Sequence, residues 1–272
     1  MMEKYAVIGN PIEHSKSPEI HTAFARQTGQ SIQYTRLLAP KHGFAAALAE
    51  FSADEGKGLS VTMPFKQDAF QQVDVKSERA VLASAVNTIK IEQDGQTSGD
   101  NTDGVGLVTD ITRNLSWPIC DQRVLILGAG GAVRGVLQPL LNESPAELVV
   151  ANRTAERAIK LVREFADLGN VSAVEIEQIY GPFDLVINAT GASLQGEVPY
   201  IPDDVIKART YCYDLTYAVT ETPFIRWAHE QGVTVTSDGL GMLVEQAALA
   251  FQIWRGMLPD TGPVIKYIRA TM

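Results

Sequence analysis

The chain has 272 residues, of which 45% are hydrophobic and 20% are charged, so we expect a packed globular protein of one large or two modest domains. The net charge is -9 and no run of five basic residues occurs, which argues against a nucleic-acid partner. The N-terminal stretch MMEKYAVIGNPIEHS has no long apolar run, and the two isolated cysteines match no metal or redox spacing. We therefore expect a cytoplasmic protein with no membrane contact and no metal.

In the first hundred or so residues, short strand-like apolar runs alternate with longer helical patterns. Strands are expected over residues 5–8, 32–38 and 59–63, and helices over 18–29, 43–51 and 68–83. Ser17 and Pro18 are typical of a helix N-cap and a first helical position. A hairpin is expected around a turn at 93–96. This alternation predicts an α/β domain with a largely parallel sheet.

A second unit starts near Asp121 with the fully apolar run Arg123–Leu127. Further strands are expected over residues 147–151, 183–187, 211–215 and 233–235. One helix is expected from the glycine-rich segment after Leu127 to about residue 141, and another over 155–167. Such a run of βαβ units is typical of a doubly wound, Rossmann-like dinucleotide fold.

Helix 105–115 is expected to link the two units, and the last two helices, 242–253 and 262–269, to return to the first unit. The predicted division is therefore 1–104 with 240–272 in one domain, and 105–239 in the other.

The loop Gly128-Ala129-Gly130-Gly131-Ala132-Val133 follows a strand and opens a helix. Glycines there let the backbone approach a pyrophosphate, and the helix N-terminus supplies free N–H groups and a positive dipole. The motif ends in Val133 instead of the usual Gly or Ala. A glycine-rich turn without a ligand is the alternative.

The second strand of this unit runs into Asn152-Arg153-Thr154, with Arg157 one helical turn later. An NAD-binding unit would place a carboxylate here for the ribose 2′-hydroxyl. Cations instead suit the charged 2′-phosphate, so the segment favours NADP over NAD. The alternative is that Arg153 and Arg157 are merely solvated.

Lys66 stands at the start of a predicted helix, where the helix dipole disfavours a cation. Either Lys66 is merely solvated, or a neighbouring group uses its proton. Asp103, in the cluster GDNTDGVG, is a candidate carboxylate partner, although a helix N-cap is the common role for Asp in such a position. Ser15 and Ser17 would suit a small carboxylate at a helix start, or would serve only as a turn and a cap.

Eight segments, taken in order, closely resemble the shikimate dehydrogenase family: NPIEHSKSP, SVTMPFK, AVNT, GDNTDGVG, GAGGAVRG, ANRT, NATGAS and DGLGMLVEQA. The resemblance spans about residues 5 to 250 and implies a substrate domain joined to a Rossmann domain. It also implies NADPH-dependent, reversible reduction of 3-dehydroshikimate to shikimate in aromatic amino-acid biosynthesis. Lys66 and Asp103 would be the catalytic pair, with the Lys66 ammonium delivering a proton to the alkoxide.

The same resemblance implies the binding residues. The substrate would contact Ser15, Ser17, Thr62, Asn87, Asp103, Tyr217 and Gln246. NADP would contact Glu78, Gly128, Ala129, Gly130, Gly131, Ala132, Asn152, Arg153, Thr154, Arg157, Thr190, Leu215 and Gly239. Two departures stand out: Ser60 occupies a position that is usually Asn, and Ala192-Ser193 follows Gly191 where the family often reads Ser-Ala-Gly.

Several other functions are compatible with parts of the pattern. A quinate/shikimate dehydrogenase of broader specificity, often NAD-linked, is the nearest. A folate methylene dehydrogenase would share the layout and a lysine, but Ser15, Ser17 and Asp103 argue against it. A non-catalytic NADP- or shikimate-binding regulator has no need of the Lys66 and Asp103 pair, and a purely structural domain leaves that pair unexplained. A monomer and a small homodimer both fit.

Overall fold

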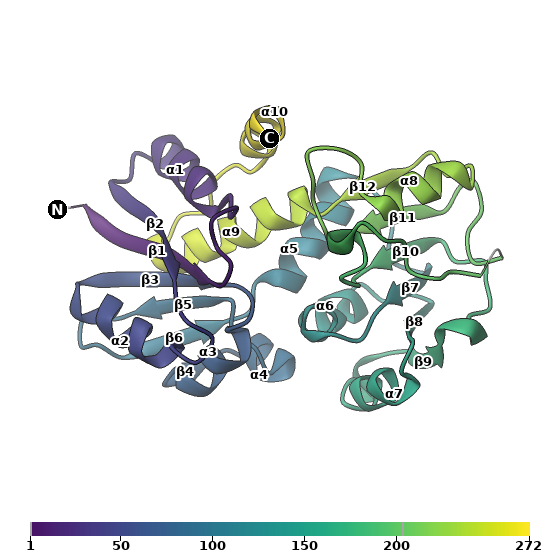
Figure 1. Cartoon of the computed structure of the whole chain (residues 1–272), viewed down its shortest axis with the longest axis horizontal. Coiled ribbons are helices and arrows are strands. Elements are labelled where there is room, and N and C mark those ends of the chain that lie inside the picture. The colour runs from purple at the N-terminus through teal and green to yellow at the C-terminus, as the bar shows by residue number, and fades with distance from the viewer. Residues whose placement is uncertain (1, 203) are drawn as a thin grey trace. The chain divides into compact units, whose positions relative to one another are not determined.

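The computed structural model describes residues 2–202 and 204–272, which form two compact units. The first unit contains the residues up to Gly106 together with Val244–Thr271, and the second unit is Leu107–Leu243. Two helices continue from one unit into the other, α5 (Asp103–Thr109) and α9 (Leu240–Arg255). Each unit is an α/β layer built on its own sheet (Figure 1).

The sheet of the first unit has the strand order β2-β1-β3-β5-β6-β4. Its strands are β1 (Glu3–Gly9), β2 (Ile32–Leu38), β3 (Gly56–Val61), β4 (Val75–Lys76), β5 (Thr88–Ile91) and β6 (Thr97–Asp100). The β1–β2, β1–β3 and β4–β6 pairs are parallel, whereas β5 is antiparallel to both β3 and β6. The expected hairpin is therefore present as β5 and β6.

Side chains alternate across this sheet because successive strand residues point to opposite faces. On one face, Ala6 and Ile8 join a core with Phe44, the first residue of α2, and Phe65, the residue just before α3; these helices lie below the sheet in Figure 1. On the other face, Tyr5 packs with Trp254 of α9. The remaining helices of the unit are α1 (Ser17–Thr28), α2 (Phe44–Ala53), α3 (Lys66–Gln72), α4 (Glu78–Ala83) and α10 (Gly262–Thr271).

The single helix expected over residues 68–83 is wrong, because α3 and α4 are separated by strand β4. Asp74 explains the break. Its carboxylate accepts hydrogen bonds from the backbone N–H and the hydroxyl of Thr97, each at 2.8 Å, which ties the segment to β6. Ser77 then caps α4 by accepting from the N–H of Ala80 at 3.1 Å. Side-chain competition of this kind diverts a helix-forming sequence.

The sheet of the second unit has the order β12-β11-β10-β7-β8-β9, and every pair of neighbouring strands is parallel. Its strands are β7 (Arg123–Leu127), β8 (Glu147–Asn152), β9 (Val171–Glu175), β10 (Leu185–Asn188), β11 (Tyr211–Asp214) and β12 (Thr236–Asp238). Counted from β7, the order is 3-2-1-4-5-6, which is the order of dinucleotide-binding Rossmann domains. The strand order reverses between β7 and β10, and ligands bind at such a switch point.

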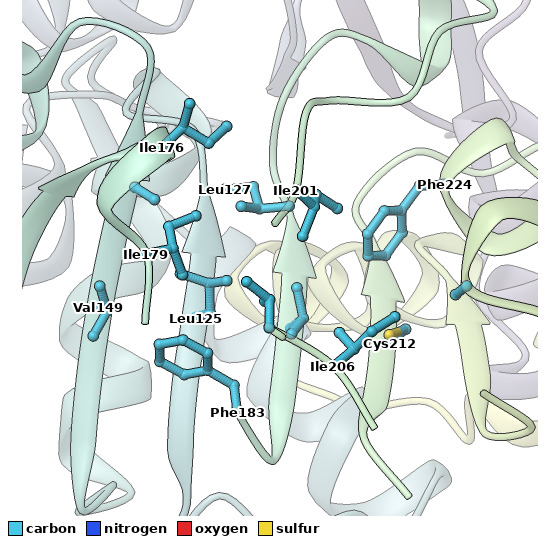
Figure 2. Close-up of a cluster of buried hydrophobic side chains, with 14 of the residues drawn as sticks. Leu125, Leu127, Val149, Ile176, Ile179, Phe183, Ile201, Ile206, Cys212 and Phe224 are labelled. Carbon is cyan, nitrogen blue, oxygen red and sulfur yellow. The ribbon is translucent and has the colours of Figure 1, made fainter. Parts of the chain in front are cut away.

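The helices of this unit are α6 (Gly131–Asn142), α7 (Ala155–Arg163) and α8 (Pro223–Glu230), with the π-helix Asp110–Asn114 after α5 and short 3₁₀ turns at Ala166–Leu168, Ile176–Gln178 and Ser193–Gln195. Figure 2 shows one buried cluster, in which Leu125, Leu127 and Val149 of adjacent strands meet Phe183 and Phe224. Fully apolar strands are expected where helices and loops cover both faces of a parallel sheet.

One strand of the second unit lies later than predicted. The expected strand 233–235 is wrong, since β12 begins at Thr236 and pairs with Cys212 of β11. Val233 is instead buried in the apolar cluster beside the end of α8, and that burial explains its hydrophobicity. In the part of the chain that the structure describes, no helix has both the length and the apolar character needed to cross a bilayer.

Candidate active site

Lys66 and Asp103 lie together in the first unit although 37 residues separate them. Lys66 is the first residue of α3, and Asp103 is the first residue of α5. The Lys66 Nζ donates to Asp103 Oδ2 at 2.6 Å, with the lysine side chain 31% exposed and the aspartate side chain 11% exposed. The carboxylate is thus bound by a cation that is open to solvent, a combination suited to proton exchange with a ligand.

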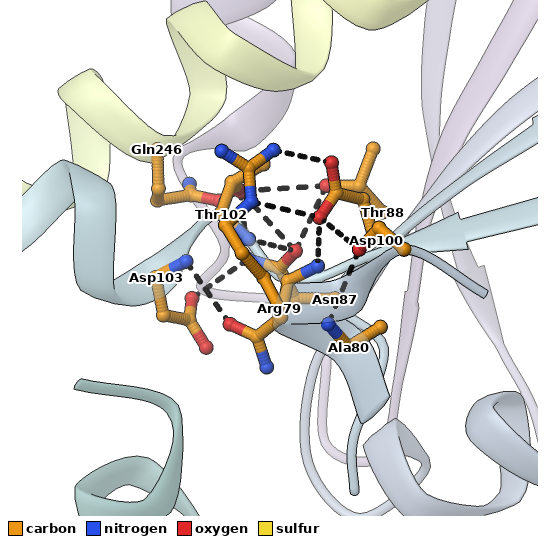
Figure 3. Close-up of polar contacts among 10 residues, drawn as sticks. Arg79, Ala80, Asn87, Thr88, Asp100, Thr102, Asp103 and Gln246 are labelled. Carbon is orange, nitrogen blue, oxygen red and sulfur yellow. Dashed lines mark hydrogen bonds and ion pairs between the residues drawn. The ribbon is translucent and has the colours of Figure 1, made fainter. Parts of the chain in front are cut away.

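A network of uncharged polar groups holds the other oxygen of this carboxylate. The Nδ2 of Asn87 donates to Asp103 Oδ1 at 2.7 Å and also lies 3.3 Å from Gln246 Oε1 of α9. The Oδ1 of Asn87 accepts from the backbone N–H of Thr102 at 2.9 Å. Figure 3 shows Asn87, Thr102, Asp103 and Gln246 grouped together, although Asn87 and Gln246 lie far from the other two in the sequence.

Helices α5 and α9 approach closely beside this network, and Gly106 makes the approach possible. A Cβ atom on Gly106 would lie only 2.7 Å from the backbone nitrogen of Gln246, a distance that side chains essentially never adopt. The glycine therefore brings the Gln246 side chain to Asn87 and Thr102.

A second carboxylate supports the strand that precedes this cluster. Asp100, at the end of β6, accepts from the Ser77 hydroxyl at 2.6 Å and from the guanidinium of Arg79. Burial opposes ionisation of Asp100, but the hydrogen bonds from Arg79 and Ser77 outweigh it, so the pKa of Asp100 is lowered. The ion pair anchors β6 to α4, as the dashed lines in Figure 3 show.

Ser15 and Ser17 lie at the start of α1, where Ser17 is the first helical residue and Lys16 is the N-cap. The prediction of Ser17 as the N-cap is wrong, because the backbone N–H of Ser17 is itself bound by the Ser15 hydroxyl at 3.3 Å. The Ser15 hydroxyl also donates to Ser17 Oγ at 3.2 Å. The guanidinium Nε of Arg36 donates to the Ser15 carbonyl at 3.0 Å, which fixes the backbone of this turn.

In the second unit, the glycine loop follows β7 as predicted. Gly128 has φ +109°, a conformation that only glycine adopts without strain, and Gly130 is the N-cap of α6 with no side chain bound to the helix end. A Cβ at Gly130 or Gly131 would meet nothing within 4 Å. The space over these glycines and the N–H groups of α6 fit a pyrophosphate.

The other cofactor candidates of this unit follow the carboxyl ends of neighbouring strands. Asn152 ends β8, Thr190 follows β10, Leu215 follows β11 and Gly239 follows β12. Because all these strands are parallel, these positions lie along the same edge of the sheet as the glycine loop. A dinucleotide binds along such an edge in doubly wound folds.

Arg153 and Arg157 are exposed at the start of α7, directly after β8. Among residues 2–202 and 204–272, no carboxylate forms an ion pair with either guanidinium. The Asn152 side chain donates to the Thr154 carbonyl at 2.9 Å and shapes the turn that presents them. Two uncompensated cations at this position fit a 2′-phosphate.

Not every candidate is brought together within one unit. Ser15, Ser17, Thr62, Asn87 and Gln246 belong to the first unit with the Lys66–Asp103 pair, whereas Tyr217 belongs to the second unit. Conversely, Glu78 is exposed at the start of α4 in the first unit, whereas the other cofactor candidates lie in the second.

Three family descriptions match the chain: shikimate dehydrogenase substrate binding domain over residues 7–89, shikimate / quinate 5-dehydrogenase over 110–196, and shikimate 5′-dehydrogenase C-terminal domain over 239–269. Shikimate dehydrogenase (NADP(+)) of Alkalilimnicola ehrlichii is 54% identical over 99% of both chains. The chain belongs to the shikimate dehydrogenase family.

Solved structures agree with this family membership. The Ael1 enzyme from Pseudomonas putida matches with a TM-score of 0.91 at 46% identity, covering 97% of each chain. Shikimate 5-dehydrogenase from Thermus thermophilus, solved in complex with NADP(H) and shikimate, matches with a TM-score of 0.89 at 32% identity over 100% of both chains. The predicted family and the two-part α/β fold are therefore confirmed.

The two residues expected to depart from the family pattern are both buried. Ser60 accepts a hydrogen bond from Tyr34 at 2.8 Å. Ser193 is buried as well, and its hydroxyl donates to Asp214 Oδ2 at 2.6 Å. Both substitutions therefore take part in buried polar networks.

The sequence patterns did not predict four residues that shape the site: Tyr34, Arg36, Thr102 and Asp214. Thr102 lies inside the motif GDNTDGVG, so its position next to Asp103 was a usable signal. The other three act through contacts with residues distant in the chain, for which the sequence carries no local pattern.

Proposed function

We propose that this protein is an NADP-dependent shikimate dehydrogenase that reversibly reduces 3-dehydroshikimate to shikimate in aromatic amino-acid biosynthesis. Its relatives at 51–54% identity over nearly the full chain carry this name. The observation that carries the proposal within this chain is the 2.6 Å contact between Lys66 Nζ and Asp103 Oδ2 in the polar cluster of the first unit.

The residues up to about 104 and from 240 onward form the substrate domain in this proposal. Ser15 and Ser17 bind the substrate carboxylate at the start of α1, where hydroxyls and the helix N-terminus favour an anion. Thr62, Asn87 and Gln246 hydrogen-bond the ring hydroxyls and the carboxylate region. Tyr217, from residues 105–239, also contacts the substrate.

Residues 105–239 form the NADP domain. The loop from Gly128 to Ala132 holds the pyrophosphate through backbone N–H groups, and Arg153 with Arg157 binds the 2′-phosphate. Thr190, Leu215 and Gly239 contact the rest of the cofactor from the strand ends, and Glu78 approaches it from the substrate domain. The exposed and unpaired guanidinium groups support NADP over NAD.

When bound, NADPH supplies a hydride from C4 of its nicotinamide to the carbonyl carbon of the substrate. The Lys66 ammonium hydrogen-bonds the carbonyl oxygen and gives it a proton as negative charge develops there. Asp103 orients the ammonium through its 2.6 Å contact and also hydrogen-bonds the product hydroxyl. In the oxidative direction the neutral Lys66 amine takes the proton back, so alkaline pH favours oxidation. Positioned proton transfer of this kind contributes roughly 10²–10⁴-fold to a rate.

The proposal is tested by following the loss of reduced nicotinamide absorbance in a mixture of purified protein and 3-dehydroshikimate, with NADPH and NADH in parallel. Turnover with a strong preference for NADPH is the expected result. The description shikimate / quinate 5-dehydrogenase also covers part of the chain, so quinate with NAD⁺ is the second arm. Efficient oxidation of quinate with NAD⁺ would indicate the broader quinate/shikimate dehydrogenase instead. Binding of both ligands without turnover would identify a regulator.

Two finer expectations go with this function. The net charge of -9 supports the absence of a nucleic-acid partner, which a gel-shift assay checks. A monomer or small homodimer in the cytoplasm is also expected, and sedimentation velocity measures that state of association.

A further inference from the structure

Thr88, the first residue of β5, places its hydroxyl group against the side-chain amide of Asn87 in the polar cluster of Figure 3. The Thr88 Oγ1 lies 2.9 Å from Asn87 Oδ1. Thr88, Asn87 and Thr102 are only 1%, 3% and 0% exposed, so water has little access to compete for the hydrogen bonds between them. Because Thr88 is so deeply buried, any effect that it has on the reaction must pass through Asn87.

The orientation of the Asn87 amide is fixed by a group that can only donate. The backbone N–H of Thr102 lies 2.9 Å from Asn87 Oδ1, and a backbone N–H has no lone pair to offer. The atom that it faces must therefore be the amide oxygen. The Thr88 hydroxyl faces the same oxygen, so it must donate as well. Together the two donors satisfy both lone pairs of this oxygen.

The amide nitrogen consequently faces the Asp103 carboxylate. One hydrogen of Asn87 Nδ2 goes to Asp103 Oδ1 at 2.7 Å. The other hydrogen points toward Thr102 Oγ1, 2.9 Å from Nδ2, and Gln246 Oε1, 3.3 Å from Nδ2. In the proposed function, a substrate hydroxyl shares this second hydrogen, because the first is committed to Asp103.

Both oxygens of Asp103 thus face hydrogen-bond donors. Lys66 Nζ donates to Oδ2 at 2.6 Å, and Asn87 Nδ2 donates to Oδ1. In this arrangement Asp103 serves only as an acceptor, so the transferable proton of the pair belongs to Lys66. The proposed mechanism depends on that distribution, because the ammonium group is its proton donor. A reversed Asn87 amide would instead place an oxygen against Asp103 Oδ1 with no hydrogen between them.

We infer that Thr88 is a positioning residue for the reduction of 3-dehydroshikimate: its hydroxyl holds the Asn87 amide with the nitrogen toward Asp103. This inference rests on the proposed function. Donation from Thr88 to the amide oxygen also strengthens the bond from the amide nitrogen to Asp103, since linked hydrogen bonds polarise one another. Thr88 thereby acts on the Lys66–Asp103 pair through Asn87, without touching substrate or cofactor.

The test compares Thr88→Val and Thr88→Ser in the NADPH-dependent reduction of 3-dehydroshikimate. Thr88→Val removes the hydroxyl and nearly keeps the shape of the side chain, and Asn87 Oδ1 retains the Thr102 N–H as a donor, so the variant is expected to fold. It should lower kcat/KM for 3-dehydroshikimate roughly tenfold and leave KM for NADPH unchanged. Thr88→Ser, which keeps the hydroxyl and loses the methyl group, should restore kcat/KM to within about twofold.

Two further variants separate an effect through Asn87 from a general loosening of the sheet. Adding Thr88→Val to Asn87→Ala should change kcat/KM no further than Asn87→Ala alone, since both residues act through one amide. Thr97→Val is the matched control. Thr97 is buried in the neighbouring strand β6, and its hydroxyl donates to Asp74 at 2.8 Å. Its loss should leave kcat/KM unchanged even where thermal unfolding shows a lower stability.

The inference is overturned if kcat/KM for 3-dehydroshikimate is unaltered in Thr88→Val or, where that variant does not fold, in Thr88→Ala. It is equally overturned if Thr88→Ser fails to restore kcat/KM, if Thr97→Val shares the loss, or if the effects of Thr88→Val and Asn87→Ala multiply. Each of these results presupposes turnover by the unmodified protein, which would leave the proposed function standing. Absence of turnover by the unmodified protein would remove the proposed function and this inference together.

Discussion

Two buried carboxylates, one in each unit, are held in opposite ways. Asp103 in the first unit meets a cation that is open to solvent, Lys66 at 2.6 Å. Asp214 in the second unit is fully buried, and its oxygens accept from the hydroxyls of Ser193 and Thr222 at 2.6 and 2.7 Å. The amide of Asn188 and the backbone N–H of Thr216 complete its shell, and all these donors are neutral.

In the proposed function, this difference separates a pair that exchanges protons with the substrate from a carboxylate that holds structure. A buried carboxylate surrounded by neutral donors is stabilised because its oxygens are satisfied by hydrogen bonds. Asp214 thereby ties the loop after β10, which contains Thr190, to the segment after β11, which contains Leu215. The Asp103 cluster instead leaves its ammonium group available for a ligand. The comparison indicates that burial of an acid alone does not mark a candidate catalytic site; the feature that distinguishes Asp103 is a cation that is open to solvent.

The largest effect is expected from removing the Lys66 ammonium group that contacts Asp103. Lys66→Ala should lower kcat by roughly 10²–10⁴-fold and change KM for 3-dehydroshikimate far less, because the lost interaction forms mainly in the transition state. Steady-state kinetics measures both constants. Lys90→Ala is the matched control, since Lys90 is 33% exposed against 31% for Lys66 and pairs with Glu92 at 2.7 Å. Equal losses in the two variants would contradict a chemical role for Lys66.

The second-largest effect is expected on the free energy of unfolding when the Asp214 carboxylate is removed. Asp214→Ala should lower the free energy of unfolding by about 3 kcal/mol, because it leaves several buried donors without an acceptor. Asp103→Ala should lower it by only about 1 kcal/mol, since Lys66 can reach water and the buried Asn87 amide keeps Thr102 and Gln246 as acceptors. Urea unfolding of both variants gives the comparison. A smaller loss for Asp214→Ala than for Asp103→Ala would reverse the roles assigned to the two clusters.

His21 sharpens the comparison because it is a buried titratable group with no donors or acceptors around it. Within the described residues, neither of its ring nitrogens has a hydrogen-bond partner. Burial lowers the pKa of His21 to about 3, so the folded protein keeps it neutral. The unfolded chain binds a proton there below its ordinary pKa of roughly 6.5. The unfolding free energy should therefore fall as pH falls from that value toward 3.

His21→Phe removes this proton uptake while retaining an aromatic ring beside Tyr34. The difference in unfolding free energy between pH 8 and pH 5 should shrink by about 2 kcal/mol in the variant. Denaturant unfolding at both pH values measures it. An unchanged pH dependence would show that His21 is already protonated or solvated in the folded state.

The smallest effect is expected at the exposed edge of the second unit. Arg153→Ala should raise KM for NADPH roughly tenfold and leave KM for NADH nearly unaltered, because only NADPH carries the 2′-phosphate. Arg163→Ala, at the exposed far end of α7, is the matched control. Parallel losses with both cofactors would show that Arg153 does not bind the phosphate.

Much of the fold was predictable because its signals are local. The apolar run of β7 followed by Gly128 identifies a strand that turns into a helix, and the observed strand order has the expected Rossmann form. The predicted helix 68–83 failed because Asp74 bonds to Thr97, 23 residues later. Helical periodicity cannot report a competing partner at that distance.

The residues of the candidate site fall into the same two groups, those with a local sequence signal and those without one. The position of Lys66 at a helix start marked it as a candidate residue, and the family motifs indicated Asp103, Ser15 and Ser17. Tyr34 and Ser60, 26 residues apart, gave no sign of their contact. Asn188 and Asp214 are separated by 26 residues as well, and they met only once β10 and β11 paired.

The amino-acid sequence alone determined the class of fold, the glycine turn and the chemical types of the groups that act, because each of these depends on neighbours along the chain. Only the tertiary structure decided which carboxylate has a cation, which has neutral donors, and that the Tyr34 hydroxyl bonds to Ser60. Those outcomes depend on strand register and helix approach, through which residues far apart in sequence come within hydrogen-bond distance.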